Sequence, residues 1–89
     1  MKWRIAFAHT AEKELAKLSS EMRLRVGRAI RALEENPIPS SAKRLKGREE
    51  FRLRVGDYRV LYSVIIYLAQ HAVNIHRFFF ASRFLALDA

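Results

Sequence analysis

The chain has 89 residues and a formal net charge of +8, from 17 Lys and Arg against nine Asp and Glu. A chain of this length predicts one domain, residues 1–89. Because cysteine is absent, disulfides, thiolate metal sites and cysteine nucleophiles are excluded, whereas the excess positive charge indicates an anionic partner such as nucleic acid, an acidic protein or a membrane surface.

Neither a membrane span nor an export signal is predicted. The longest nearly uncharged stretch, residues 63–76, is shorter than the roughly 20 apolar residues that a spanning helix needs. The N-terminal residues lack the apolar core and small-residue cleavage site of a signal peptide. We therefore expect a cytoplasmic protein that does not act at a membrane.

The first half of the chain predicts a strand followed by two helices. Apolar residues alternate with other side chains over residues 2–8, which favours a strand. Farther along, apolar side chains recur every three or four positions, as on one face of a helix. The members of this stripe are Leu15, Leu18, Met22, Val26, Ile30 and Leu33. We expect Thr10 and Ser20 to cap two separate helices and Asn36-Pro37 to end the second.

The second half reads as a loop and three strands. The loop covers residues 37–43, and the candidate strands cover 50–55, 58–68 and 72–81. The order β-α-α-β-β-β predicts the α+β class: an antiparallel sheet with a two-helix hairpin packed on one face.

A basic hairpin, FRLRVGDYRVLY at residues 51–62, is the most informative stretch. Side chains alternate along a strand, so Arg52 and Arg54 point to one face. A two-residue turn at Gly56-Asp57 pairs Arg54 with Arg59. Like charges directly opposite on a sheet cost about 0.2–1 kcal/mol.

Two interpretations of this hairpin stay open. An Arg side chain holds phosphate oxygens at two points, so the hairpin is a candidate phosphate clamp. The alternative is a solvated basic face that Glu49, Glu50 and Asp57 neutralise in part.

Residues 36–62, NPIPSSAKRLKGREEFRLRVGDYRVLY, resemble the signature of the RelE/ParE superfamily of toxins from type II toxin–antitoxin systems. The shared features are Asn-Pro after the second helix, a K-x-L-K-G segment at residues 43–47, and R-x-R-V-G-D-Y-R-V-x-Y. The resemblance, RelE-like more than ParE-like, implies an endoribonuclease that cuts mRNA in the ribosomal A site. It implies metal-free attack of the ribose 2′-hydroxyl on the adjacent phosphate.

By position, the resemblance assigns Arg59 to the scissile phosphate and Arg52 and Arg54 to its flanking phosphates. It also implies an arginine on the last strand, which is Arg77 or Arg83 according to the register. We favour Arg83 as the catalytic residue, because the three phenylalanines after Arg77 read as core strand. The residues expected to contact RNA outside the catalytic set are Lys43, Arg44, Lys46 and Arg77.

The group that removes a proton is not evident from these arginines, because Arg does not release its proton in proteins. Several members of the superfamily have a Tyr close after the last-strand arginine, but the last Tyr here is Tyr67. His76 is either an acid or base or a strand residue beside the core. The histidines lack metal-like spacing, so we expect no metal and no cofactor.

Other functions remain possible at this point. The stretch IHRFFFASR resembles the ParE-like ending R-x-x-H-x-x-R, with Phe80 in place of the His, which implies a DNA gyrase inhibitor. A catalytically weakened homologue is the third reading. The expected partners are a small cognate antitoxin, the ribosome and mRNA, or alternatively DNA gyrase.

Overall fold

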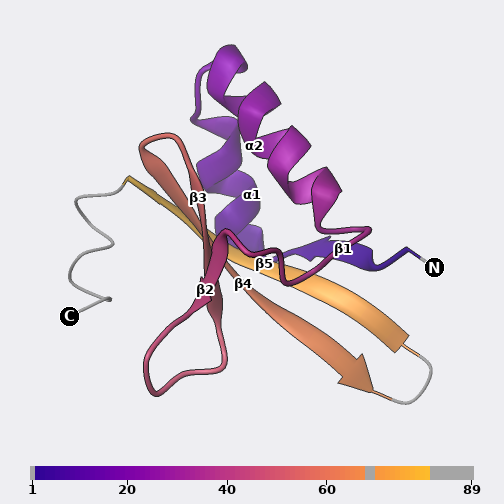
Figure 1. Cartoon of the computed structure of the whole chain (residues 1–89). Helices are drawn as coiled ribbons and strands as arrows, with labels where there is room; N and C mark the ends of the chain where they lie inside the picture. Colours follow the sequence, from indigo (N-terminus) through magenta and orange to yellow (C-terminus); the bar gives the residue numbers. More distant parts are fainter. Residues whose placement is uncertain (1, 68–69, 81–89) are drawn as a thin grey trace.

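The computed structural model describes residues 2–67 and 70–80. Its elements are β1 (Arg4–Phe7), α1 (His9–Ala16), α2 (Ser20–Ala32), β2 (Ala42–Arg44), β3 (Phe51–Val55), β4 (Tyr58–Tyr67) and β5 (Gln70–Phe80). The strands form one sheet in the order β1-β5-β4-β3-β2, and both helices lie on the same side of it (Figure 1). The predicted α+β class is confirmed.

The edges of the sheet differ from the prediction. β1 pairs with β5 in parallel, so the sheet is mixed rather than wholly antiparallel. A parallel pair needs a long crossover, and here the connection from β1 to β5 runs through both helices and the other strands. β2 begins inside the predicted loop, and its three residues are too few to show an alternating pattern.

Both predicted helix caps were wrong by one or two positions. The N–H of Ala8 still donates to the Ile75 carbonyl at 2.9 Å, at the end of the β1–β5 ladder. Ala8 is also the N-cap of α1, which begins at His9. Thr10 therefore lies inside the helix. At α2 the cap is Ser19 rather than Ser20, because the Ser19 Oγ accepts from the Met22 N–H at 3.2 Å.

The core lies between the helices and the sheet face beneath them. The largest fully buried side chains are Tyr62, Leu33, Ile75, Val26, Val60 and Val73. The Tyr62 hydroxyl donates to the Pro37 carbonyl at 2.8 Å, and burial raises the pKa of Tyr62 to about 12. This bond ties the segment after α2 to the centre of the sheet. In the part of the chain that the structure describes, no helix has the length and apolar character to cross a membrane.

Gly27 offers a direct test of this helical layer. It lies in α2, and a Cβ at this position would meet nothing within 4 Å. Gly27→Ala should raise the free energy of unfolding by about 0.5–1 kcal/mol, because alanine loses less backbone entropy in a helix. Thermal unfolding should show a melting temperature several degrees higher. A lower melting temperature would contradict the placement of Gly27 in open space.

Candidate nucleic-acid interface

The β3–β4 hairpin has the predicted register. Val55 pairs with Tyr58 and Arg54 with Arg59, which leaves Gly56-Asp57 as a two-residue turn. Gly56 has φ of +60°, a backbone conformation that favours glycine. Leu53, which pairs with Val60, is buried toward the helices.

We call the opposite surface of the sheet the open face. From strand alternation and register, it carries Lys43, Arg52, Arg54, Arg59, Leu61 and Ser63. Lys43 lies opposite Arg52, and Arg54 lies opposite Arg59, so positive groups from three neighbouring strands share this surface. The structure thus brings three of the four predicted catalytic arginines together. Arg83 lies outside the described residues.

Arg59 is held in place by the turn that precedes it. Its Nη1 donates to the Gly56 carbonyl at 3.2 Å and to the Tyr58 carbonyl at 3.0 Å, and its side chain is half-buried. Arg54, directly opposite, is exposed. The pair therefore combines one guanidinium fixed on backbone carbonyls with one that reaches into solvent.

Arg25 is a further member that the sequence did not single out. A Cβ built on Gly56 would lie 3.0–3.2 Å from the guanidinium atoms of Arg25, so this α2 side chain covers the turn. In the sequence, Arg25 lies outside the apolar stripe of α2, and that position gives no sign of this contact. The glycine in the turn is the one sequence signal that another group comes close there.

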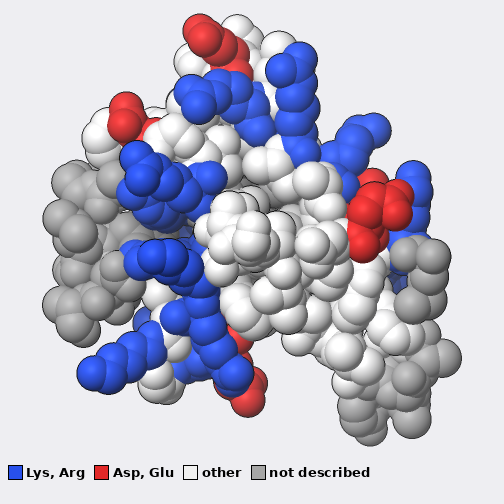
Figure 2. All heavy atoms as spheres, viewed as in Figure 1, with Lys and Arg blue, Asp and Glu red and all other residues white. Residues whose placement is uncertain are grey.

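Basic side chains continue from the hairpin onto β2 and the β2–β3 loop. Figure 2 shows Lys and Arg gathered on the side of the molecule where these elements lie. Residues 44–49 line a shallow hollow of about 430 Å³, in which Arg44 and Lys46 are exposed; Lys43, just before it on β2, is also exposed. The structure therefore places one of these three predicted RNA contacts, Lys43, on the open face, and the other two, Arg44 and Lys46, where β2 runs into the loop.

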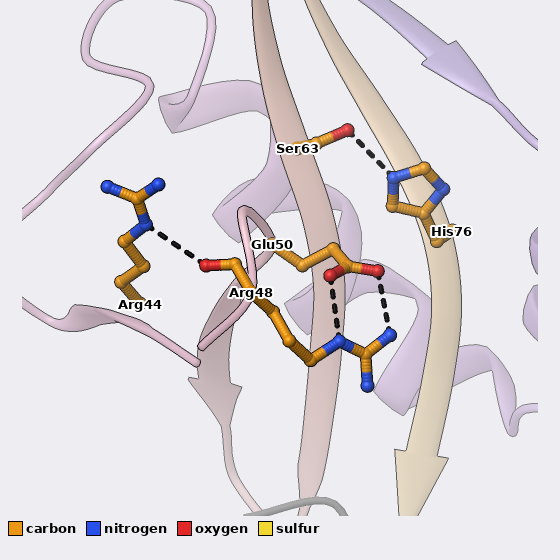
Figure 3. A network of polar contacts seen from close by, with 5 residues as sticks. All are labelled: Arg44, Arg48, Glu50, Ser63 and His76. Atoms are coloured by element: carbon orange, nitrogen blue, oxygen red, sulfur yellow. Dashed lines mark hydrogen bonds and ion pairs between the residues drawn. The ribbon is translucent and has the colours of Figure 1, made fainter. Parts of the chain in front are cut away.

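Two interactions shape this loop (Figure 3). Arg44 Nε donates to the Arg48 carbonyl at 3.1 Å, and the Arg48 guanidinium donates twice to Glu50 at 2.9 Å. The bonds from Arg48 lower the pKa of Glu50, against the effect of partial burial. Arg48 is thereby neutralised, whereas Lys46 projects into solvent.

A bulge in the β4–β5 ladder changes which side chains of β5 face the helices. Leu61 pairs with Arg77 and Tyr62 pairs with Ile75, so His76 has no residue opposite it. Ile75 and Phe78, three positions apart, are both buried in the core. The bulge lets two consecutive residues, His76 and Arg77, both turn away from the core.

Ordinary strand alternation separates the three phenylalanines, which the sequence suggested to be one core strand. Phe78 is in the main core, but Phe79 packs with Leu45 and Leu61 in a second, smaller cluster. Phe80 is 49% exposed and meets Tyr58 edge-on, with ring centroids 5.1 Å apart.

Arg77 is anchored to α1. Its Nε and Nη2 donate to the Glu14 carboxylate at 2.8–3.0 Å, and the Phe78 N–H donates to the same carboxylate at 3.0 Å. The guanidinium also lies 4.6 Å from the centre of the Phe79 ring. Burial alone would raise the pKa of Glu14, but these hydrogen bonds outweigh it and the net shift is downward, while the bonds from Glu14 raise the pKa of Arg77.

A family model and several solved structures of toxins match this chain. The family model described as the ParE toxin of the type II toxin–antitoxin system parDE matches residues 5–82. No curated protein sequence matched the chain.

Several solved structures are similar over nearly their whole length. RelE of the archaeal RelE–RelB complex from Pyrococcus horikoshii OT3 is 26% identical, with a TM-score of 0.78 over 93% of this chain and 99% of that one. The RelBE2 toxin–antitoxin complex of Mycobacterium tuberculosis is 28% identical, with a TM-score of 0.75 over 90% and 99%. The intact RelBE complex of E. coli is 27% identical, with a TM-score of 0.75 over 89% and 96%.

The Arg54–Arg59 pair should destabilise the unliganded protein. Arg54→Thr is expected to raise the free energy of unfolding by about 0.2–1 kcal/mol at low salt, because it removes a like charge directly opposite Arg59. The gain should shrink as salt screens the repulsion. Arg4→Thr is the matched control, because Arg4 lies opposite Ala72. A loss of stability on Arg54→Thr that does not depend on salt would show that the two charges do not interact.

The Glu14–Arg77 contact should appear in the pH dependence of stability. Because the pKa of Glu14 is lowered on folding, its stabilisation is complete above the pKa of an unfolded glutamate, about 4.3, and is lost as the pH falls through the lower folded value. Glu14→Gln should lower the free energy of unfolding by about 1–2 kcal/mol at pH 7, and the difference from wild type should close below about pH 4. Denaturant unfolding measures both, with the exposed Glu12→Gln as control. An unchanged difference across this range would contradict the assignment.

Proposed function

Because this chain belongs to the ParE toxin family of type II toxin–antitoxin systems, we propose that it acts as a ribosome-dependent endoribonuclease that cleaves mRNA in the A site and so inhibits translation. The observation that carries this proposal is the facing pair Arg54 and Arg59, with Arg52 on the same face of the same hairpin. A polyanionic strand laid across the open face would turn an unfavourable cluster of charge into a binding site.

The chemistry we propose is metal-free transesterification. The ribose 2′-hydroxyl loses its proton to solvent as its oxygen attacks the adjacent phosphorus, and negative charge builds up on the phosphoryl oxygens. The bond from phosphorus to the 5′-oxygen breaks, and the 5′-oxygen takes a proton from water. Arg59 is suited to this charge because its position is already fixed by the carbonyls of the turn. A donor positioned before the reaction stabilises the transition state without reorganising.

The other basic residues would bind and align the strand. Arg52 and Arg54 would hold the phosphates on either side, since neighbouring positions on one strand face suit successive phosphates. Lys43 on the open face, together with Arg44 and Lys46 where β2 runs into the loop, would extend the contact to mRNA. Arg77 would add a contact at the β5 edge, oriented by Glu14. Arg83 remains the proposed second catalytic arginine of the C-terminal strand.

Inhibition of DNA gyrase is the second candidate, and the ParE family model favours it. We place it second for two reasons. The three structural relatives described above, at 26–28% identity, carry RelE or RelBE in their names. The arginine row on paired strands also suits a phosphodiester chain better than it suits a folded protein surface.

A small antitoxin protein is the proposed inhibitor, and the cytoplasm is the proposed site of action. Several similar structures are complexes of RelE with RelB, which motivates this partner. An antitoxin that covers the open face would need acidic residues where it docks, because it would have to match the charge of the arginine row.

Replacing Arg59 tests the nuclease. Arg59→Ala should relieve growth arrest on induction and lower the cleavage rate about 10²–10³-fold, as expected for loss of one preorganised donor. Mapping of transcript 5′ ends should show cuts inside codons for wild type and none for the variant. Arg28→Ala, an exposed change on α2, is the control and should behave as wild type.

Two outcomes would count against the nuclease. Growth arrest with intact transcripts and DNA double-strand breaks would favour gyrase inhibition. Arrest of translation without mapped cuts would remove RNA cleavage from the account while leaving binding in place.

A further inference from the structure

The β4–β5 hairpin extends past the strand that covers its outer side. β3 pairs with β4 only as far as Tyr62, which lies opposite Phe51, the first residue of β3, whereas β4 continues to Tyr67 and stays paired with β5. Figure 1 shows β4 and β5 running on together beyond β3. Among the residues that the structure describes, none forms a ladder with β4 beyond Tyr62 on the β3 side. Residues 64–67 are therefore a free strand edge, which we call the β4 edge.

Backbone hydrogen-bonding groups point out of the β4 edge. In an antiparallel pair, alternate residues direct both their N–H and their C=O toward the partner strand, and the pair that closes a two-residue turn does so. That closing pair is Val55 with Tyr58. Counting by twos from Tyr58, Val64 and Ile66 direct their backbone groups to the side where β3 has ended. These groups can accept one more strand.

The side chains of the β4 edge are apolar and partly exposed. Val64 packs against the core, Ile65 is 37% exposed and Ile66 is 66% exposed. From residue 60 to residue 70 the sequence has no charged residue and no proline. Charged side chains and proline are the usual means by which a strand edge resists pairing with another chain. The β4 edge lacks both.

The two outer edges of the sheet differ from the β4 edge in this respect. β1, at one end of the sheet, has four residues and begins with Arg4. β2, at the other end, has three residues, of which two are Lys43 and Arg44. Short length and basic side chains discourage a further strand from adding. An incoming strand is therefore expected at the β4 edge.

A second copy of this chain fits the β4 edge better than an acidic partner does. An antitoxin needs negative charge to match the arginine row, and the β4 edge has no charge for it to meet. A second copy presents the same apolar strand, so a two-fold axis makes the contact self-complementary. Antiparallel pairing about that axis puts Val64 opposite Ile66 of the second copy, and it puts the two Ile65 residues opposite each other.

The net charge of +8 does not oppose this arrangement. Arg59 comes six positions before Ile65, a separation of about 20 Å along a strand. Antiparallel pairing sends the two hairpins in opposite directions, so the two Arg59 residues lie about 40 Å apart. This separation is several times the screening length of about 8 Å at physiological salt. The arginine rows of the two copies therefore repel each other little.

We propose that two copies of this chain pair through the β4 edge and form one continuous sheet across the two-fold axis. The inference does not depend on the proposed nuclease function, and the contact lies away from the arginine row. Because residues 64–66 of each copy make the contact, it is small, and contacts below about 1,200 Å² are typical of weak complexes. The dimer should therefore form as the concentration rises.

Sedimentation equilibrium of the isolated chain, from micromolar to near-millimolar concentration, tests the pairing. The average mass of wild type should rise with concentration from 10.4 kDa toward twice that value. Ile66→Lys should stay at 10.4 kDa throughout, because it places a charge on the pairing strand. Leu24→Lys is the matched control, since Leu24 on α2 is 63% exposed, and it should dimerise as wild type does.

Cysteine cross-linking tests the register of the contact. The chain has no cysteine of its own. The two Ile65 residues would form a pair without hydrogen bonds, in which Cα atoms lie about 4.5 Å apart, a distance that a disulfide can span. Ile65→Cys should therefore give a disulfide-linked dimer on mild oxidation, whereas Leu24→Cys should not.

Thermal unfolding of each variant separates loss of pairing from loss of fold. Wild type that stays monomeric at every concentration would overturn the proposal and leave the β4 edge to another occupant, such as the antitoxin. A dimer lost in Leu24→Lys but kept in Ile66→Lys would place the contact on α2 and would also overturn it. If Ile66→Lys does not fold, Ile65→Cys decides, because a dimer of wild type without this cross-link contradicts pairing through residues 64–66.

Discussion

The repulsion between Arg54 and Arg59 is the interaction on which this account of the molecule depends. Two arginines are directly paired across a hairpin whose register is fixed by a two-residue turn. A shift of that register by one residue would turn every arginine of one strand toward the core, at a large cost in burial of charge. The hairpin therefore cannot relieve the repulsion by slipping, and an anion bound on the open face would reduce it.

Two sets of contacts support this surface: one joins the sheet to the segment after α2, and the other joins β5 to α1. Tyr62, buried under the hairpin, fastens the segment after α2 through its bond to Pro37. Where β1 ends, Glu14 takes the place of a neighbouring strand by accepting from the Phe78 N–H, and it anchors Arg77 at the same time. The bulge beside that contact directs His76 away from the core. Adjacent residues of β5 thus support this surface from the side.

The sequence predicted the parts that short-range rules determine. Alternation and Gly56-Asp57 were sufficient for the Arg54–Arg59 pair, and the apolar stripe was sufficient for α2. Features that depend on distant partners were not predicted: the parallel β1–β5 pair, the ion pair of Glu14 with Arg77 across 63 positions, and Arg25 over Gly56. The bulge was missed for the same reason, because only the pairing with β4 shows that His76 has no residue opposite it. The roles of Arg52, Arg54, Arg59 and Arg83 remain predictions.

A double-mutant cycle on Arg54 and Arg59 tests the central claim most directly. The free energy of unfolding is measured for wild type, each Thr variant and the double variant, first alone and then with a saturating short oligoribonucleotide. We expect a coupling energy that is repulsive in the free protein, about 0.2–1 kcal/mol at low salt, and that becomes attractive with RNA bound. A coupling near zero in both states, or one of unchanged sign, would contradict a shared anion site on the open face.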